Sequence, residues 1–195
     1  MKICVYGASS NAIDPAYLAA GEELGRRLAQ RGHGLVFGGG ADGMMGALAR
    51  GAHECGGEII GVAPSFFNVD GILYEHSTEF IYTDTMRQRK QIMEEMADAF
   101  VMTAGGIGTF EEFFEILTLR QLGQHKKPIA VLNTKGYYDS MEAMLRGAVE
   151  GRFMKKACLD LFGFFEDTDA LLSYLEQPTV GTDFMQMKYA REEEE

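Results

Sequence analysis

Short apolar runs alternate with helical patterns along most of the chain, and this alternation limits the possible folds more than any other feature. The runs lack a regular apolar–polar alternation, which is typical of strands that are covered on both faces. Leu161–Phe165 is a less clear candidate of the same kind. The remaining predicted strands are Ile3–Tyr6, Leu35–Phe37, Ile59–Val62, Phe80–Tyr82, Phe100–Thr103 and Ile129–Leu132.

Helical patterns fill the segments between these runs. Asp14 and Pro15 are typical of an N-cap and a first helical position, and Gly32 is a typical stop. Gly21 and Gly25 predict close packing of this helix against another. Further helices are expected at residues 43–55, 85–97, 109–122, 138–150 and 168–176. Strand–helix alternation with short connections predicts an α/β fold in which a parallel sheet carries helices on both faces.

Length and composition indicate one globular domain. The chain has 195 residues, of which 46% are hydrophobic and 24% charged. We expect a single domain at residues 1–178 and an acidic C-terminal tail at 179–195, where the last four residues are glutamates. No apolar run has the roughly 20 residues of a membrane span, and no signal peptide is recognisable.

Charge and cysteine content narrow the classes of partner. A net charge of −11 argues against nucleic-acid binding, because an acidic surface repels phosphate backbones. The three cysteines and four histidines are scattered and predict no metal site. A sparse, odd number of cysteines is typical of a reducing compartment, so we expect a cytoplasmic protein.

Three glycine-rich turns follow predicted strands, and in a parallel sheet all three would lie on one rim. They are Gly7–Ser10, Gly38–Gly43 and Gly105–Thr109. The second matches the G-x-G-x-x-G pattern of dinucleotide-binding enzymes. However, it follows the second strand instead of the first, and no acidic residue ends the next strand. A nicotinamide-dependent dehydrogenase is therefore a weaker alternative.

The third turn favours phosphate binding. Gly105-Gly106-Ile107-Gly108-Thr109 enters a helix, where backbone N–H groups are free and the helix dipole attracts anions. The alternative is a tight turn whose small residues serve packing alone.

Acidic and basic side chains accompany this turn. Thr109 and Glu112 fit a capping box, but the apolar helix around Glu112 also favours a desolvated carboxylate able to act on a sugar C1. Arg87, Arg89 and Lys90 lie near a helix N-terminus, where cations oppose the dipole. An anionic ligand would relieve that opposition; a solvated basic face is the alternative.

Two other features are a set of methionines at helical spacing and a segment without a regular pattern. Met86, Met93 and Met96 recur at helical spacing, and we interpret them as core residues. Pro64–Ser77 has no clear pattern and is expected to be a loop over the site.

With these motifs in place, the sequence resembles the LONELY GUY (LOG) family, cytokinin riboside 5′-monophosphate phosphoribohydrolases that are often mislabelled as lysine decarboxylases. The family motif P-G-G-x-G-T-x-x-E corresponds to Ala104–Glu112, and M-H-E-R-K corresponds to Met86–Lys90. The likeness extends over residues 1–177 and includes Gly7–Ser10, Gly38–Gly40, Met44–Gly46, Gly61–Pro64, Gln121–Gly123, Lys126–Pro128, Asn133 and Gly136–Tyr138.

The resemblance implies a three-layer Rossmann-like fold, at least a homodimer, and hydrolysis of the N-glycosidic bond of an AMP-like or N6-modified nucleotide without cofactor or metal. It implies that Arg89 and Glu112 form the catalytic pair. The substrate-binding residues that it implies are Gly39, Gly40, Lys90, Gly105, Gly106, Ile107, Gly108, Thr109 and Thr118.

The chain departs from the family pattern at three positions: Ala104 replaces the proline, and Arg87 and Gln88 replace His and Glu. The main alternative function is a non-catalytic nucleotide or molybdenum-cofactor carrier on the same scaffold. A pyridoxal-phosphate lysine decarboxylase is a weaker one, because no lysine has the context of a Schiff-base residue.

Overall fold

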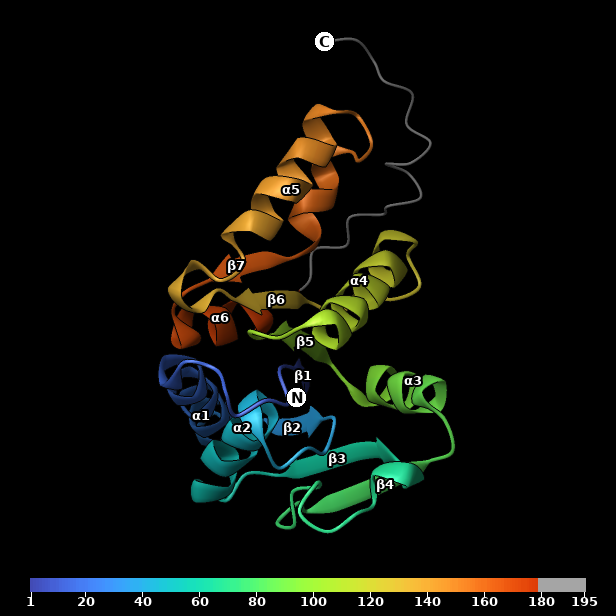
Figure 1. Ribbon diagram of the computed structural model, residues 1–195. Helices are drawn as coiled ribbons and strands as arrows, with labels where there is room; N and C mark the ends of the chain where they lie inside the picture. The colour runs from blue at the N-terminus through green and yellow to red at the C-terminus, as the bar shows by residue number, and fades with distance from the viewer. Residues whose placement is uncertain (179–195) are drawn as a thin grey trace.

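The computed structural model describes residues 1–178, which form a seven-stranded parallel sheet and six α-helices (Figure 1). The strands are β1 (Lys2–Tyr6), β2 (Gly34–Phe37), β3 (Ile59–Pro64), β4 (Glu79–Thr83), β5 (Ala99–Met102), β6 (Ile129–Leu132) and β7 (Gly163–Phe165). The helices are α1 (Pro15–Gln30), α2 (Gly43–Glu54), α3 (Met86–Met96), α4 (Ile107–Gln121), α5 (Asp139–Glu150) and α6 (Thr168–Leu175). The acidic tail expected at residues 179–195 lies outside the described residues.

The order of the strands places a ligand crevice beside β1. The sheet runs β4-β3-β2-β1-β5-β6-β7, and every pair is parallel. The chain moves outward from β1 to β4, and α3 then returns it to β5 on the other side of β1. The direction of winding therefore reverses between β1 and β5. Open α/β sheets bind ligands at such a switch point, outside the carboxyl ends of the strands.

Helices cover both faces of the sheet, which confirms the predicted three-layer α/β fold. Along β1, Ile3 and Val5 pack toward α1, α2 and α6, whereas Cys4 and Tyr6 pack toward α3, α4 and α5. Figure 1 shows α1, α2 and α6 on one side of the strands and α3 and α4 on the other. Burial on both faces explains why the strands read as continuous apolar runs.

The first helix forms as its sequence predicts. The Asp14 carboxylate accepts a hydrogen bond from the Ala16 N–H at 2.9 Å, and Pro15 is the first helical residue. A Cβ at Gly25 would lie 2.1 Å from the Leu48 carbonyl oxygen, so only glycine permits this approach of α1 to α2. The predicted close packing is confirmed.

The start of α4 differs from expectation, and a capping box lies on another helix. Helix α4 begins at Ile107 with Gly106 as its N-cap, two residues before the predicted start at Thr109. A capping box does occur, but at the start of α3, where Thr85 and Gln88 cap each other's backbone.

Among residues 1–178, no helix combines the length and apolarity that a membrane crossing requires.

Candidate active site

The three glycine-rich turns line one cavity of about 650 Å³ at the carboxyl ends of β1, β2 and β5. This volume is within the range of about 300–1,000 Å³ that is typical of small-molecule sites. Gly7–Ser10, Gly38 and Gly40, and Gly106–Thr109 all contribute to its wall. The predicted shared rim is therefore present.

Backbone contacts hold these turns together. The Ala8 N–H donates to the Ala104 carbonyl at 3.1 Å, and the Ala8 carbonyl accepts from the Met44 N–H at 2.8 Å. A Cβ at Gly43 would lie 2.6 Å from the Ala8 carbonyl oxygen. The Asn11 side chain also accepts from the Gly43 N–H at 2.7 Å. The cavity thus has a rigid floor made largely of main chain.

A buried ion pair joins α3 to α4 at the cavity. The Arg89 Nη1 donates to the Glu112 Oε1 at 2.8 Å, and the Arg89 Nε donates to the Val62 carbonyl at 3.1 Å. Each of the two charged side chains is only 10% exposed. A Cβ at Gly38 would lie 2.2 Å from the Arg89 Nη2, so the second glycine turn leaves the space that the guanidinium occupies.

Burial shapes the protonation of Glu112. Desolvation raises the pKa of this carboxyl above its ordinary value, while the Arg89 charge and hydrogen bond oppose the rise. Glu112 was compatible with a capping box at Thr109, but that interpretation is wrong. Helix α4 starts at Ile107, and the Glu112 carboxylate binds Arg89.

The turn after β5 presents uncapped amides. Gly106 precedes the first turn of α4, and no side chain caps it. The amides at the start of a helix have no intrahelical partner, and the dipole makes this end positive. Ile107 is 86% exposed, so the turn is open to solvent. This arrangement fits a phosphate or another small anion.

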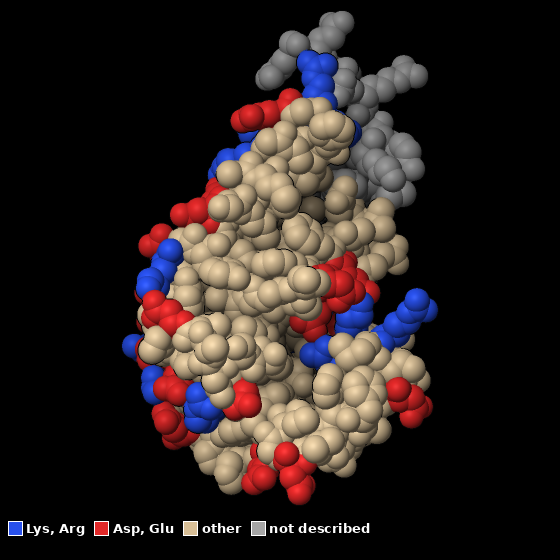
Figure 2. Space-filling model, viewed as in Figure 1, with Lys and Arg blue, Asp and Glu red and all other residues tan. Residues whose placement is uncertain are grey.

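The interpretation of Arg87, Arg89 and Lys90 as one solvated basic face is wrong for two of them. Arg89 is buried in the cavity wall, and Lys90 pairs with Glu111 and with Glu115, the latter at 2.8 Å. These hydrogen bonds raise the pKa of Lys90, although its partial burial acts in the opposite direction. Figure 2 shows acidic and basic side chains meeting beside a hollow where α3 faces α4.

The structure brings most of the expected site residues to the cavity. Arg89 and Glu112 line it. The expected substrate-binding residues that also line it are Gly40, Gly106, Ile107, Gly108 and Thr109. Those outside its wall are Gly39, Lys90, Gly105 and Thr118. Gly105 lies directly behind the turn, where a Cβ would meet the Thr109 hydroxyl oxygen at 2.1 Å.

Sequence reasoning missed the apolar half of the wall. The helical spacing predicts that Met86 and Met93 are core residues; Met93 is fully buried as expected, but Met86 is 41% exposed and lines the cavity. The loop Pro64–Ser77 supplies Phe67, Ile72 and Leu73. The signal in the sequence is the set of apolar residues in a segment without a strand or helix pattern: Phe66, Phe67, Val69, Ile72 and Leu73.

Backbone hydrogen bonds fix this loop to the second glycine turn. The Tyr74 N–H donates to the Gly39 carbonyl at 2.8 Å, and the Ala41 N–H donates to the Ile72 carbonyl at 2.9 Å. The predicted loop over the site is confirmed, and it is anchored at its middle.

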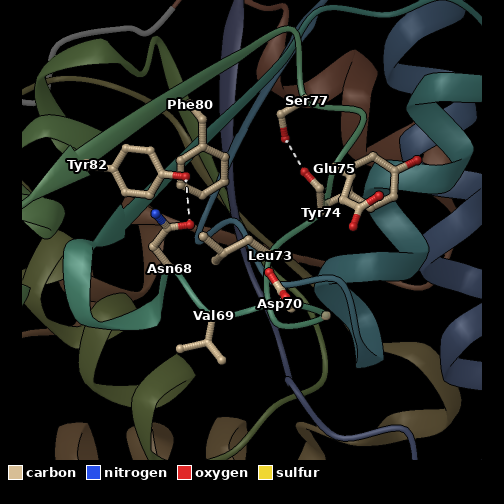
Figure 3. Close-up of a pocket in the computed structure, with 10 residues that line it drawn as sticks. Asn68, Val69, Asp70, Leu73, Tyr74, Glu75, Ser77, Phe80 and Tyr82 are labelled. Carbon is tan, nitrogen blue, oxygen red and sulfur yellow. Dashed lines mark hydrogen bonds between the residues drawn. The ribbon is translucent and has the colours of Figure 1, made fainter.

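A second, smaller cavity of about 300 Å³ lies under the same loop (Figure 3). Phe80 and Tyr82 of β4 form one side, and the Tyr82 hydroxyl donates to the Asn68 side chain at 3.3 Å. Leu73 lines both this cavity and the larger one, so the two spaces adjoin at this residue.

Comparison with known proteins identifies the family. A family model described as "Possible lysine decarboxylase" matches residues 45–175. The chain is 36% identical to cytokinin riboside 5′-monophosphate phosphoribohydrolase LOG2 of Arabidopsis thaliana over 90% of this chain and 83% of that protein. It is 39% identical to LOG7 of the same plant, over 78% of this chain and 70% of that protein.

The chain belongs to the LOG family.

Solved structures support the family's fold. The protein TM1055 superposes with a TM-score of 0.70 at 23% identity, over 91% of this chain and 99% of that one. The molybdenum cofactor carrier protein of Chlamydomonas reinhardtii superposes with a TM-score of 0.66 at 24% identity, over 88% of this chain and 94% of that one. At these identities the likeness concerns the fold alone. Within residues 1–178, no cluster of three or more His, Cys, Asp or Glu side chains is arranged to hold a metal ion.

Proposed function

We propose that this protein hydrolyses the N-glycosidic bond of AMP-like nucleoside 5′-monophosphates and releases the free base and ribose 5-phosphate. The observation that carries the proposal is the buried Arg89–Glu112 pair beside the uncapped Gly106–Thr109 turn. The two relatives above are named phosphoribohydrolases, which supports the same reaction.

The sheet order suggests how the nucleotide lies. The phosphate would bind the amides of the β5–α4 turn, on one side of β1. The base would then extend toward β2 and the Pro64–Ser77 loop, on the other side. That end of the cavity is apolar and includes Met45, Phe67, Leu73 and Met86, which suits a planar base with an apolar N6 substituent.

The chemistry would depend on the carboxylate of Glu112. As the bond between C1′ and the base breaks, positive charge develops on the ribose, and a nearby carboxylate stabilises it or positions the attacking water. The base leaves with the bonding electrons and takes up a proton, and water supplies the hydroxyl group at C1′. Arg89 would hold the carboxylate in place and favour its ionised form, whereas burial acts in the opposite direction.

Binding energy from the phosphate supports catalysis at a distance. Contacts to a part of the substrate that does not react can hold C1′ against Glu112. The 5′-monophosphate should therefore be cleaved and the unphosphorylated riboside should not.

We also propose the assembly and the compartment. The resemblance to LOG proteins suggests a homodimer or a higher homo-oligomer, and a single functional domain at residues 1–178. The three cysteines, Cys4, Cys55 and Cys158, are all free, which is compatible with the cytoplasm.

The direct test is incubation of the purified protein with AMP and with N6-isopentenyladenosine monophosphate in the presence of a metal chelator, followed by chromatography. Release of free base from either nucleotide supports the proposal, and the ratio of the two rates reports the N6 preference. Glu112→Gln should abolish turnover but retain nucleotide binding. Tight binding with no release of base by the folded wild-type protein would favour the carrier function. The molybdenum cofactor carrier protein compared above has a similar fold.

A further inference from the structure

The turn between β6 and α5 sends two tyrosine hydroxyls to backbone carbonyls at the start of the candidate phosphate-binding turn and just before it. The Tyr137 hydroxyl donates to the Gly105 carbonyl at 2.8 Å. The Tyr138 hydroxyl donates to the Thr103 carbonyl at 2.7 Å. Neither tyrosine lines the cavity, so both hydroxyls reach this backbone from behind, and the Tyr137 hydroxyl is the one that bonds the turn itself.

The bond from Tyr137 determines where the next amide points. A peptide unit is planar and trans, so its C=O and N–H point in opposite directions. Gly105 lies outside the cavity wall and Gly106 lies in it. By holding the Gly105 carbonyl on the far side, the Tyr137 hydroxyl turns the Gly106 N–H toward the cavity.

Neighbouring side chains hold the Tyr137 ring in place. It packs edge-on against Tyr17, with ring centroids 5.6 Å apart, and against Tyr138, at 4.8 Å. The Tyr138 N–H donates to the Asn133 side chain at 2.7 Å, which fixes the turn from which both hydroxyls extend. The hydroxyl of Tyr137 is therefore positioned before any ligand binds.

We propose that Tyr137 is a positioning residue for the 5′-phosphate of the substrate, acting through the Gly105–Gly106 peptide unit. The inference rests on the proposed function, because it assumes that the Gly106–Thr109 turn holds the phosphate. Glycines at 105 and 106 leave this peptide free to rotate, so an external bond is needed to keep one orientation.

The test is Tyr137→Phe, which keeps the ring and its packing but removes the hydroxyl. The matched control is Tyr17→Phe, which removes a hydroxyl from the neighbouring ring and leaves the bond to Gly105 intact. Binding of ribose 5-phosphate, AMP and adenosine is measured by calorimetry for each protein, and thermal midpoints are recorded. Ribose 5-phosphate and adenosine are not cleaved under the proposed reaction, so their affinities are independent of the hydrolysis assay, and AMP is titrated in the Glu112→Gln background.

We expect Tyr137→Phe to weaken the binding of ribose 5-phosphate and of AMP by about threefold to tenfold, which is the usual contribution of one hydrogen bond. Adenosine, which has no phosphate, should bind within about twofold of wild type, as should all three ligands to Tyr17→Phe. In the hydrolysis assay, KM for AMP should rise more than kcat falls.

Three results would overturn the inference. Unchanged affinity of Tyr137→Phe for ribose 5-phosphate would mean that the hydroxyl does not position the amide. Equal losses of affinity for adenosine and for the phosphorylated ligands would mean that Tyr137 stabilises the fold and does not act on the phosphate site in particular. Failure of the wild-type protein to bind ribose 5-phosphate would mean that the Gly106–Thr109 turn is not a phosphate-binding site. By contrast, phosphate-selective loss in a protein that hydrolyses nothing would refute the proposed reaction and leave this inference standing.

Discussion

Replacing Arg89 by methionine will leave the Glu112 carboxylate buried without its charged partner. Both side chains are 10% exposed, and their closest atoms are 2.8 Å apart. Two unit charges about 4 Å apart interact by about 4 kcal/mol at an effective dielectric constant of about 20. Removing one member of a buried pair typically costs about 3–5 kcal/mol. We expect Arg89→Met to lower the free energy of unfolding by about 3–5 kcal/mol at about pH 8.

The loss should depend on pH in a defined direction. Burial already raises the pKa of Glu112 in the folded protein, and removal of the Arg89 charge will raise it further. A carboxyl whose folded pKa exceeds its unfolded pKa takes up its proton more readily when folded. Its contribution to stability is therefore complete below the unfolded pKa and is lost as pH rises through the folded pKa. Arg89→Met should be less destabilised at about pH 5 than at about pH 8.

A second substitution isolates the charge. Adding Glu112→Gln to Arg89→Met removes the unpaired carboxylate and keeps nearly the same side-chain volume. The double variant should recover at least about half of the loss at about pH 8 and show little pH dependence. Urea unfolding followed by circular dichroism at both pH values measures these differences. A single variant as stable as wild type at the higher pH, or a double variant no more stable than Arg89→Met, would refute the reasoning.

The same geometry gives three other expected outcomes. Gly38→Ala should reduce activity at least about tenfold, because its Cβ would meet the Arg89 guanidinium; Gly147→Ala, with nothing within 4 Å of its Cβ, is the control and should retain activity. Leu73→Ala should join the two cavities and raise kcat/KM for bulky N6-substituted monophosphates relative to AMP by about threefold or more; an unchanged ratio would mean that the base lies elsewhere. The acid limb of the pH–kcat/KM profile should lie above the ordinary glutamate pKa of 4.5, because burial raises the pKa of Glu112, and a limb below it would exclude Glu112 as the titrating group.

Most of the fold was predictable because the signals are local. A strand covered on both faces must be a continuous apolar run, and each clear run in the sequence became a strand. Leu161–Phe165 was harder, since a 3₁₀ turn over Lys156–Leu161 shortens β7 to Gly163–Phe165. The start of α4 was misplaced because Thr109 and Glu112 fit a capping box, while the true N-cap, Gly106, has no side chain to signal it.

The site was predictable only in part, for the opposite reason. Arg89 and Glu112 were found through motifs, and the family resemblance assigned them as a pair. Their contact joins residues 23 apart in sequence, which no local rule would have found. Met86 shares a helical face with Met93, but Met86 is the first residue of α3 and is exposed, whereas Met93 is buried in the core. The loop residues Ile72 and Leu73 had no periodicity, because backbone bonds to the second glycine turn determine their place.

The pairing of β1 with β5 also determines when during folding the cavity can exist. Ile3 pairs with Ala99 and Tyr6 with Met102, so the centre of the sheet joins segments nearly half the chain apart. Such non-local pairing is slow, and it cannot start during synthesis until β5 has left the ribosome. Until then one edge of the apolar strand β1 is unpaired and open to association with other chains. Closure of this central pair brings the three glycine-rich turns to one rim, whereas β6 and β7 add beside β5 later in the chain. Ligand binding is therefore expected to report on chains in which β1 and β5 have paired.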